Sequence, residues 1–191
     1  QPLWNFATTQ GEVLYLSLED SFQRIQTRLF DLTEDAPPTL HFAIMADMLK
    51  HGLEQQIGQF LTDHPATKLV VIDTLQRVRS AGGDSNLYAN DYQDVGLLKQ
   101  LADKQHIAIL LIHHLRKLHD DDPMNMISGS TGLSGAADST FVFQKNSRLA
   151  NVASLHCTGR DIPDRTLKLE FGVEDHVWKL LEDSKTCSGA S

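Results

Sequence analysis

The sequence has little cysteine, no long apolar run and a shortage of positive charge. Its two cysteines, Cys157 and Cys187, lie far apart, so we expect no disulfide framework and a reducing, cytoplasmic compartment. No apolar run approaches the roughly 20 residues that a membrane-spanning helix needs. The first residues also lack the basic and then apolar pattern of a signal peptide. We therefore expect a soluble protein with no membrane partner.

The charge balance limits the partners. The sequence has 17 Lys and Arg residues against 25 Asp and Glu residues, a formal net charge of −8. This excludes a broad cationic face for duplex DNA or an anionic membrane, so any nucleic-acid contact must use a few local cations. A length of 191 residues with 41% apolar residues fits one globular domain. We assign residues 1–182 to this domain and residues 183–191 to a polar tail.

Three short apolar runs, at residues 13–18, 69–72 and 107–112, predict strands. They are apolar throughout and rich in branched side chains, which is typical of parallel strands buried on both faces. Apolar residues at helical spacing lie between them: Phe22, Ile25 and Leu29; Leu53, Ile57 and Leu61; and Val95, Leu98, Leu101 and Ala102. Alternating strands and helices predict an α/β fold with a mainly parallel central sheet.

The pattern changes from about residue 140. Short or alternating apolar segments separated by turns predict an antiparallel C-terminal extension of the sheet. These segments are 140–143, 151–156, 166–171 and 177–181. Segments rich in Gly, Pro, Asp and Asn predict loops. These are 31–38, 80–88 and 114–127.

Polar residues follow each predicted parallel strand. These are the pairs Glu19-Asp20, Asp73-Thr74 and His113-His114. Ligands of open parallel sheets bind beyond the carboxyl ends of the strands, so we expect the three pairs to converge. Each acid has an alternative interpretation as a helix cap. Two acids and an imidazole around one crevice indicate either metal-assisted hydrolysis or phosphoryl transfer.

Asp73 ends the run LVVID, the form of a Walker B carboxylate that holds Mg²⁺ beside nucleotide phosphates. Taken with four other segments, it gives the chain a resemblance to the RepA-like branch of RecA-type ATPases, which includes ring-shaped hexameric replicative helicases. The five segments are GEVLYLSLED at 11–20, LVVIDTLQRVR at 69–79, IAILLIHHLRK at 107–117, MISGSTGLSGAADS at 126–139 and TGRDIPDRTLKLEF at 158–171. The resemblance implies a RecA-like three-layer sandwich, ATP and Mg²⁺ as cofactors, single-stranded DNA as a partner, and a homo-oligomer, a hexameric ring in the complete protein.

The resemblance also implies roles for residues at the strand ends. Glu19 is expected to polarise the attacking water, and Asp73 to lie on the magnesium side, with Thr74 beside it at the nucleotide. His114, assisted by His113, is expected to sense the γ-phosphate, although the residues alone leave open which histidine does so.

Arg160, in the segment TGRD, resembles an arginine finger that reaches the phosphates of a neighbouring subunit. Such a finger accelerates the reaction because it neutralises charge in the transition state. The alternative is a surface cation paired with Asp161.

The region 114–139 is expected to face DNA, because the resemblance places a DNA-contacting loop after the sensor strand. Arg116 and Lys117 would neutralise phosphates there, with Ser130 in a glycine-rich stretch that permits close backbone approach. The alternative for that stretch is a plain loop. The acidic run at residues 120–122 works against DNA affinity.

The sequence has no G-x-x-x-x-G-K-[ST] phosphate loop, and none of its glycines precedes a lysine. That loop supplies the backbone amides and the lysine that hold the phosphates, so we expect this chain alone to be inactive. The resemblance places the loop and its strand just before residue 12, so we expect an N-terminally truncated domain without its P-loop strand. That strand would lie between those ending at Asp73 and His113. Without it, these two strands pair directly, or another segment or chain fills a gap, or the strand belongs to a part outside this sequence.

Three further functions stay open. A non-catalytic RecA-like scaffold or partner-binding module without turnover fits the missing phosphate loop. A metal-dependent hydrolase would use His113, His114 and His119 with Asp120 or Asp122, but this spacing matches no known metal motif. A serine hydrolase is a weaker alternative, because the sequence has no G-x-S-x-G.

Overall fold

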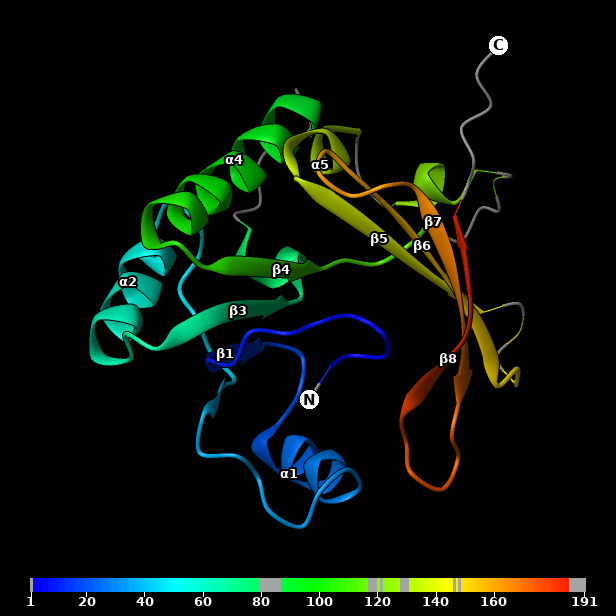
Figure 1. Cartoon of the computed structure of the whole chain (residues 1–191). Coiled ribbons are helices and arrows are strands. Elements are labelled where there is room, and N and C mark those ends of the chain that lie inside the picture. The colour runs from blue at the N-terminus through cyan, green and yellow to red at the C-terminus, as the bar shows by residue number, and fades with distance from the viewer. Residues whose placement is uncertain are drawn as a thin grey trace.

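The computed structural model describes residues 2–79, 87–116, 120, 122–127, 131–145, 147 and 149–185. Two four-stranded sheets organise these residues, with the orders β2-β1-β3-β4 and β5-β6-β7-β8. The first is parallel and the second antiparallel, and Figure 1 shows them side by side. Within the described residues no helix is both long and apolar enough to cross a membrane.

The parallel sheet contains the three predicted strands. They are β1 (Glu12–Ser17), β3 (Thr67–Asp73) and β4 (Ala108–Ile112). The edge strand β2 (Leu40–Ala43) was not predicted, because the sequence LHFA is short and interrupted by a histidine. Its position follows from pairing with β1, where Leu40 lies beside Val13.

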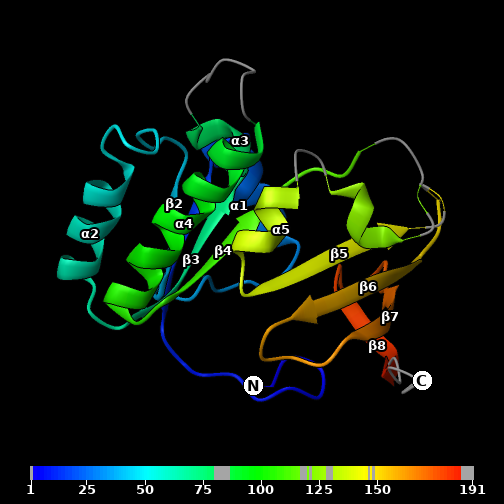
Figure 2. The same ribbon diagram turned by 90° about the horizontal axis from the view of Figure 1, so that it is seen from above.

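Helices cover both faces of the parallel sheet, which makes three layers. The predicted helices are α1 (Phe22–Phe30), α2 (Leu53–Asp63) and α4 (Leu87–Gln105). In Figures 1 and 2, α2 and α4 lie on one face and α1 on the other. Shorter helical segments are α3 (Leu75–Val78), the 3₁₀ segment η2 (Pro123–Met126) and α5 (Thr131–Ala136). The predicted α/β sandwich is confirmed.

The main core lies between the parallel sheet and the α2 and α4 layer. Leu16 and Ile72 of the sheet belong to the same buried cluster as Leu53 and Leu98 of the helices. The prediction that all three strands are buried on both faces was wrong for β4. Leu110 is 40% exposed, because β4 is the last strand of the sheet and has a neighbour on one side only.

The strands β3 and β4 pair directly. Their parallel register runs from Leu69 beside Ala108 to Asp73 beside Ile112. This is the first of the three outcomes that the sequence left open for the position of the P-loop strand. The backbone groups of β3 and β4 that a strand between them would use are bonded to each other.

Two predicted loops contain helical residues, and one of them is the segment 114–127, which includes η2. Residues 80–86 of the segment 80–88 lie outside the described residues, but residues 87 and 88 already belong to α4. Within the glycine-rich stretch, for which a plain loop was the alternative, Thr131–Ala136 form α5, in which Gly132, Leu133 and Ala136 are buried. Glycine disfavours helix, but here packing of Leu133 and Ala136 into the core outweighs that local preference.

The antiparallel C-terminal strands are confirmed, but they form a sheet of their own instead of extending the parallel sheet. Its strands are β5 (Ser139–Lys145), β6 (Val152–Gly159), β7 (Arg165–Phe171) and β8 (Trp178–Lys185). Leu167 and Leu169 are buried in its core, and the N-terminal Trp4 packs there, donating from Nε1 to the Trp178 carbonyl at 2.7 Å. Because β8 extends to Lys185, the first residues of the predicted tail belong to this sheet, and residues 186–191 lie outside the described residues.

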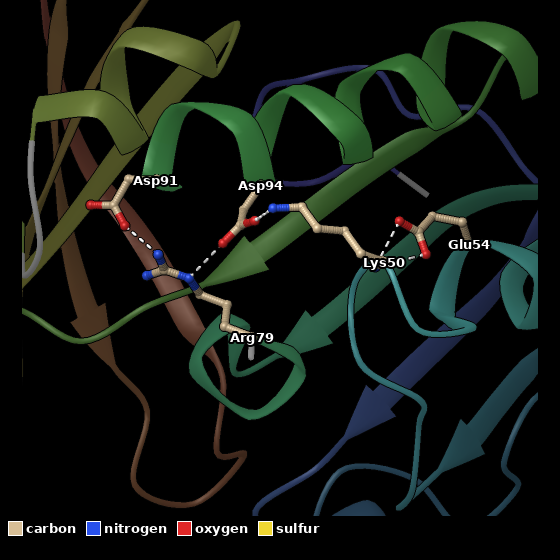
Figure 3. A network of polar contacts seen from close by, with 5 residues as sticks. All are labelled: Lys50, Glu54, Arg79, Asp91 and Asp94. Carbon is tan, nitrogen blue, oxygen red and sulfur yellow. Dashed lines mark hydrogen bonds and ion pairs between the residues drawn. The ribbon is translucent and has the colours of Figure 1, made fainter. Parts of the chain in front are cut away.

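A network of charges joins α4 to the loops beneath it (Figure 3). Arg79 bonds to Asp91 and, at 3.0 Å, to Asp94. Lys50 lies 2.9 Å from Asp94, and its backbone N–H donates to Glu54 at 3.1 Å. Asp91 is only 1% exposed, so its ionised carboxylate is stable in the interior only because these partners compensate for the lost solvation.

We expect Asp91→Ala to lower the free energy of unfolding by about 3 kcal/mol, because it removes the more deeply buried of the two carboxylates that pair with Arg79. Urea unfolding at constant m-value measures the change. Asp103→Ala is the matched control on the same helix, because Asp103 is 66% exposed and pairs only loosely with Lys99 at 3.5 Å. Equal losses in the two variants would contradict the prediction.

Candidate active site

Three predicted residues meet beyond the carboxyl ends of the parallel strands. Glu19 follows β1, Thr74 follows β3 and His114 follows β4. The Thr74 hydroxyl donates to Glu19 Oε1 at 2.9 Å, and Glu19 Oε2 lies 3.9 Å from His114 Nε2. Thr74 is buried, whereas Glu19 and His114 are 46% and 68% exposed. The carboxylate is therefore anchored on one side and open to solvent on the other.

Asp73 is held separately from this cluster. Its side chain accepts a hydrogen bond from the Tyr15 hydroxyl at 2.7 Å, and its backbone carbonyl accepts one from Leu18 at 2.7 Å. Burial raises the pKa of Tyr15, and the bond to Asp73 raises that pKa further. The phenol therefore stays protonated and keeps donating to the carboxylate. Glu19 and Asp73 thus have different hydroxyl partners, which orient the two carboxylates independently.

The cap interpretation of the two acids does not hold. The N-cap of α1 is Ser21, whose hydroxyl accepts from the Arg24 backbone N–H at 3.4 Å. Asp20 is bound to α1 by ion pairs with Arg24 and Arg28. The N-cap of α3 is Thr74, which makes no side-chain cap bond and donates to Glu19 instead. Capping therefore falls to the neighbouring residues and leaves Glu19 and Asp73 for other contacts.

The two histidines have different surroundings. His114 is exposed and approaches Glu19, whereas His113 is only partly exposed. The structure therefore brings His114 to the cluster. Among the described residues, His113 and His114 belong to no group of three ligands close enough to share an ion, which counts against the metal hydrolase. Of its other ligands, His119 lies outside the described residues, while Asp120 and Asp122 accept local bonds from Asn125 and Met124.

Arg160 directly follows β6 of the antiparallel sheet. Its guanidinium donates to the Gly135 carbonyl at 3.3 Å and lies 3.6 Å from Asp138. It remains 56% exposed. The alternative pairing with Asp161 was wrong, because Asp138 is the ion partner. The pKa of Asp138 is lowered, mainly by a hydrogen bond from Lys99 and also by the Arg160 charge.

The predicted DNA-facing residues are only partly described. Arg116 is exposed, and its backbone N–H donates to the Met126 carbonyl at 2.6 Å. This bond and the antiparallel bridge between Leu115 and Ile127 hold these two stretches of backbone side by side. Lys117 and Ser130 lie outside the described residues.

Tyr15 is the site residue that the sequence did not predict. It lies within the apolar run of β1, where an aromatic side chain is typical of core packing. The available signal was a phenol hydroxyl two positions from the end of β1. Its function depends on Asp73, which is 58 residues away in the sequence.

The sequence profile described as the AAA domain matches residues 1–120. Among solved structures, one ATPase domain aligns with a TM-score of 0.73 at 18% identity, over 90% of this chain and 75% of its own. A DnaB-like replicative helicase, whose structure is described together with its interactions with primase, aligns with a TM-score of 0.71 at 18% identity. This alignment covers 90% of this chain and 51% of the helicase chain. The RadB recombinase aligns with a TM-score of 0.58 at 16% identity, over 90% of this chain and 80% of the recombinase chain.

A search of curated proteins found no significant match. This chain spans about half the length of the DnaB-like helicase that it matches. At such identities the structural likeness shows the fold, and this fold is the RecA-like one of helicase and recombinase ATPase domains.

Proposed function

Since the chain belongs to the AAA domain family, we propose that it is the ATPase domain of a replicative-helicase motor of the RepA-like branch. The complete motor is a homo-oligomer, a hexameric ring, that couples ATP hydrolysis to single-stranded DNA. The convergence of Glu19, Thr74 and His114 beyond the parallel strands supports the proposal most strongly. Open parallel sheets bind their ligands at this edge.

The chemistry of the donor groups fits ATP with Mg²⁺, because Mg²⁺ prefers carboxylate oxygens and water. Bound Mg²⁺ would neutralise the phosphate charge that develops during transfer. Asp73 is the carboxylate on the magnesium side, and the Tyr15 hydroxyl fixes its orientation. The Thr74 hydroxyl likewise fixes the orientation of the Glu19 carboxylate.

Glu19 polarises the attacking water. The Thr74 hydroxyl engages Oε1, so Oε2 is the oxygen that faces His114 and solvent. In this proposal His114, whose Nε2 lies 3.9 Å from Glu19 Oε2, responds to charge beside Glu19 and passes that change to the segment that begins at Arg116. Arg116, with Lys117 and Ser130, contacts the single strand in this proposal.

A second function has one observation in its favour. The direct pairing of β3 with β4 occupies the position where RecA-like sheets hold the P-loop strand. Because the chain has no phosphate-loop motif, the alternative is a RecA-like scaffold that assembles or binds a partner without turnover.

ATPase assays on the complete native protein distinguish these functions. We expect hydrolysis of ATP with Mg²⁺ that single-stranded DNA stimulates and duplex DNA does not, because the chain has no broad cationic face. We expect the 191-residue chain alone to show no micromolar ATP binding by isothermal titration, because it has no phosphate-loop lysine. A complete protein without any turnover would support the scaffold and refute the motor.

A further inference from the structure

A second polar cluster lies at the opposite end of the parallel strands, where β1 begins. Glu12 begins β1, His41 lies in β2 and His64 directly follows α2. Both imidazoles point to the same carboxylate oxygen: His41 Nε2 lies 2.9 Å and His64 Nδ1 2.8 Å from Glu12 Oε2. The three ligand atoms all lie within 4.8 Å of one another. The six residues of β1 separate this cluster from Glu19 by roughly 16 Å of strand.

The backbone around His64 fixes the position of its ring. The His64 N–H donates to the Phe60 carbonyl at 2.8 Å. The His64 carbonyl accepts from the Thr67 N–H at 3.1 Å and from the Thr67 hydroxyl at 2.7 Å. The Phe60 ring stacks on the imidazole with centroids 4.3 Å apart. A ring held in this way loses little freedom when it binds an ion.

His41 and Glu12 are also held by their surroundings. The β1–β2 register places His41 beside Leu14, and its ring meets Phe60 edge-on at 5.3 Å. The Glu12 backbone N–H donates to the Ala66 carbonyl at 3.0 Å. The three ligands therefore come from rigid elements, which is what a preformed metal site requires.

The electrostatic environment favours a cation. The Glu12 carboxylate carries a full negative charge when ionised, and the carboxyl end of the 11-residue helix α2 adds a partial one at His64. The side chains of Glu12, His41 and His64 are 22%, 26% and 34% exposed. Solvent therefore reaches the cluster and supplies water for a further coordination position.

We propose that Glu12, His41 and His64 bind a zinc ion. Two imidazole nitrogens, one carboxylate oxygen and a water form a recognised tetrahedral donor set for Zn²⁺. Metal–ligand distances of about 2.0–2.1 Å separate tetrahedral ligands by roughly 3.3 Å. The present separations of 2.8 and 2.9 Å thus need to widen by only about half an ångström. The ion replaces ring protons, cross-links β1, β2 and the end of α2, and lies outside the candidate active site.

Isothermal titration of the chelator-treated protein with ZnCl₂ tests the proposal. We expect one ion per chain. The variants His41→Ala, His64→Ala and Glu12→Gln should each weaken binding at least as much as the roughly 10- to 100-fold that loss of an outer-shell partner costs. His51→Ala is the matched control, because His51 is exposed and should bind no ion. An equal loss in His51→Ala, or no stoichiometric binding, would overturn the site and leave Glu12 as a hydrogen-bond acceptor for two histidines.

X-ray absorption on the zinc-loaded protein identifies the ligands. We expect a nitrogen and oxygen shell at about 2.0–2.1 Å with imidazole scattering. Sulfur at about 2.3 Å would assign the ion to a cysteine and overturn the proposal. Thermal unfolding checks that each variant folds without zinc. Saturating zinc should raise Tm by roughly 5–10 °C in the parent and by much less in the three ligand variants.

Discussion

Glu19→Gln is expected to lower kcat for ATP hydrolysis in the complete motor by about 10²- to 10⁴-fold, the usual contribution of a positioned general base. The amide still accepts the hydrogen bond from Thr74, so the local geometry is kept. It cannot take a proton from the attacking water, because it lacks the negative charge and basicity of the carboxylate. Steady-state assays with saturating ATP measure the loss, and nucleotide binding should persist.

Asp20→Asn is the matched control for Glu19→Gln. Asp20 is the next residue in the chain, but it pairs with Arg24 and Arg28 at the start of α1. We expect its loss to change turnover little, because Asp20 pairs with the exposed arginines of α1 and not with Glu19, Thr74 or His114. If Glu19→Gln retained turnover comparable to that of Asp20→Asn, the role of Glu19 in water activation would be refuted, and the cluster would be structural.

Local patterns were enough to predict most of the fold. The spacing of Leu53, Ile57 and Leu61 predicted α2, because one helix face must be apolar to pack on a sheet. Patterns failed where packing decided the outcome. The helix α5 forms despite its glycines because Leu133 and Ala136 enter the core. No local signal in LHFA indicated an edge strand, since its pairing partner is β1.

The candidate site was predictable for a topological reason. Parallel strands end at one edge, so polar residues that follow them meet, as Glu19, Thr74 and His114 do. The bond from Tyr15 to Asp73 was not predictable from local sequence. The cluster at Glu12 was missed for the same reason, because its histidines lie 29 and 52 residues away and share no motif spacing. Sequence reasoning thus found the residues set by topology and missed those set by side-chain packing.

Arg160→Ala is expected to lower kcat in the complete motor by about 10³- to 10⁵-fold, the range for loss of an arginine finger. Arg160 directly follows β6 of the antiparallel sheet, and its guanidinium contacts Gly135 and Asp138. Its 56% exposure leaves the guanidinium able to reach another subunit. Lys168→Ala is the control, because Lys168 is an exposed cation of the same sheet, paired with Glu182. Equal losses of kcat in the two variants would show that Arg160 is a surface charge without a role in catalysis.

Mixing the two inactive variants tests whether Arg160 acts between subunits. In a ring of Glu19→Gln and Arg160→Ala subunits, some interfaces combine an intact Glu19 with an intact Arg160 from the neighbour. Random equal mixing leaves about a quarter of the head-to-tail interfaces complete, so about a quarter of the wild-type turnover should return. An Arg160 that served its own chain would give no recovery, because every chain in the mixture lacks one of the two groups. Recovery therefore requires a site shared between subunits.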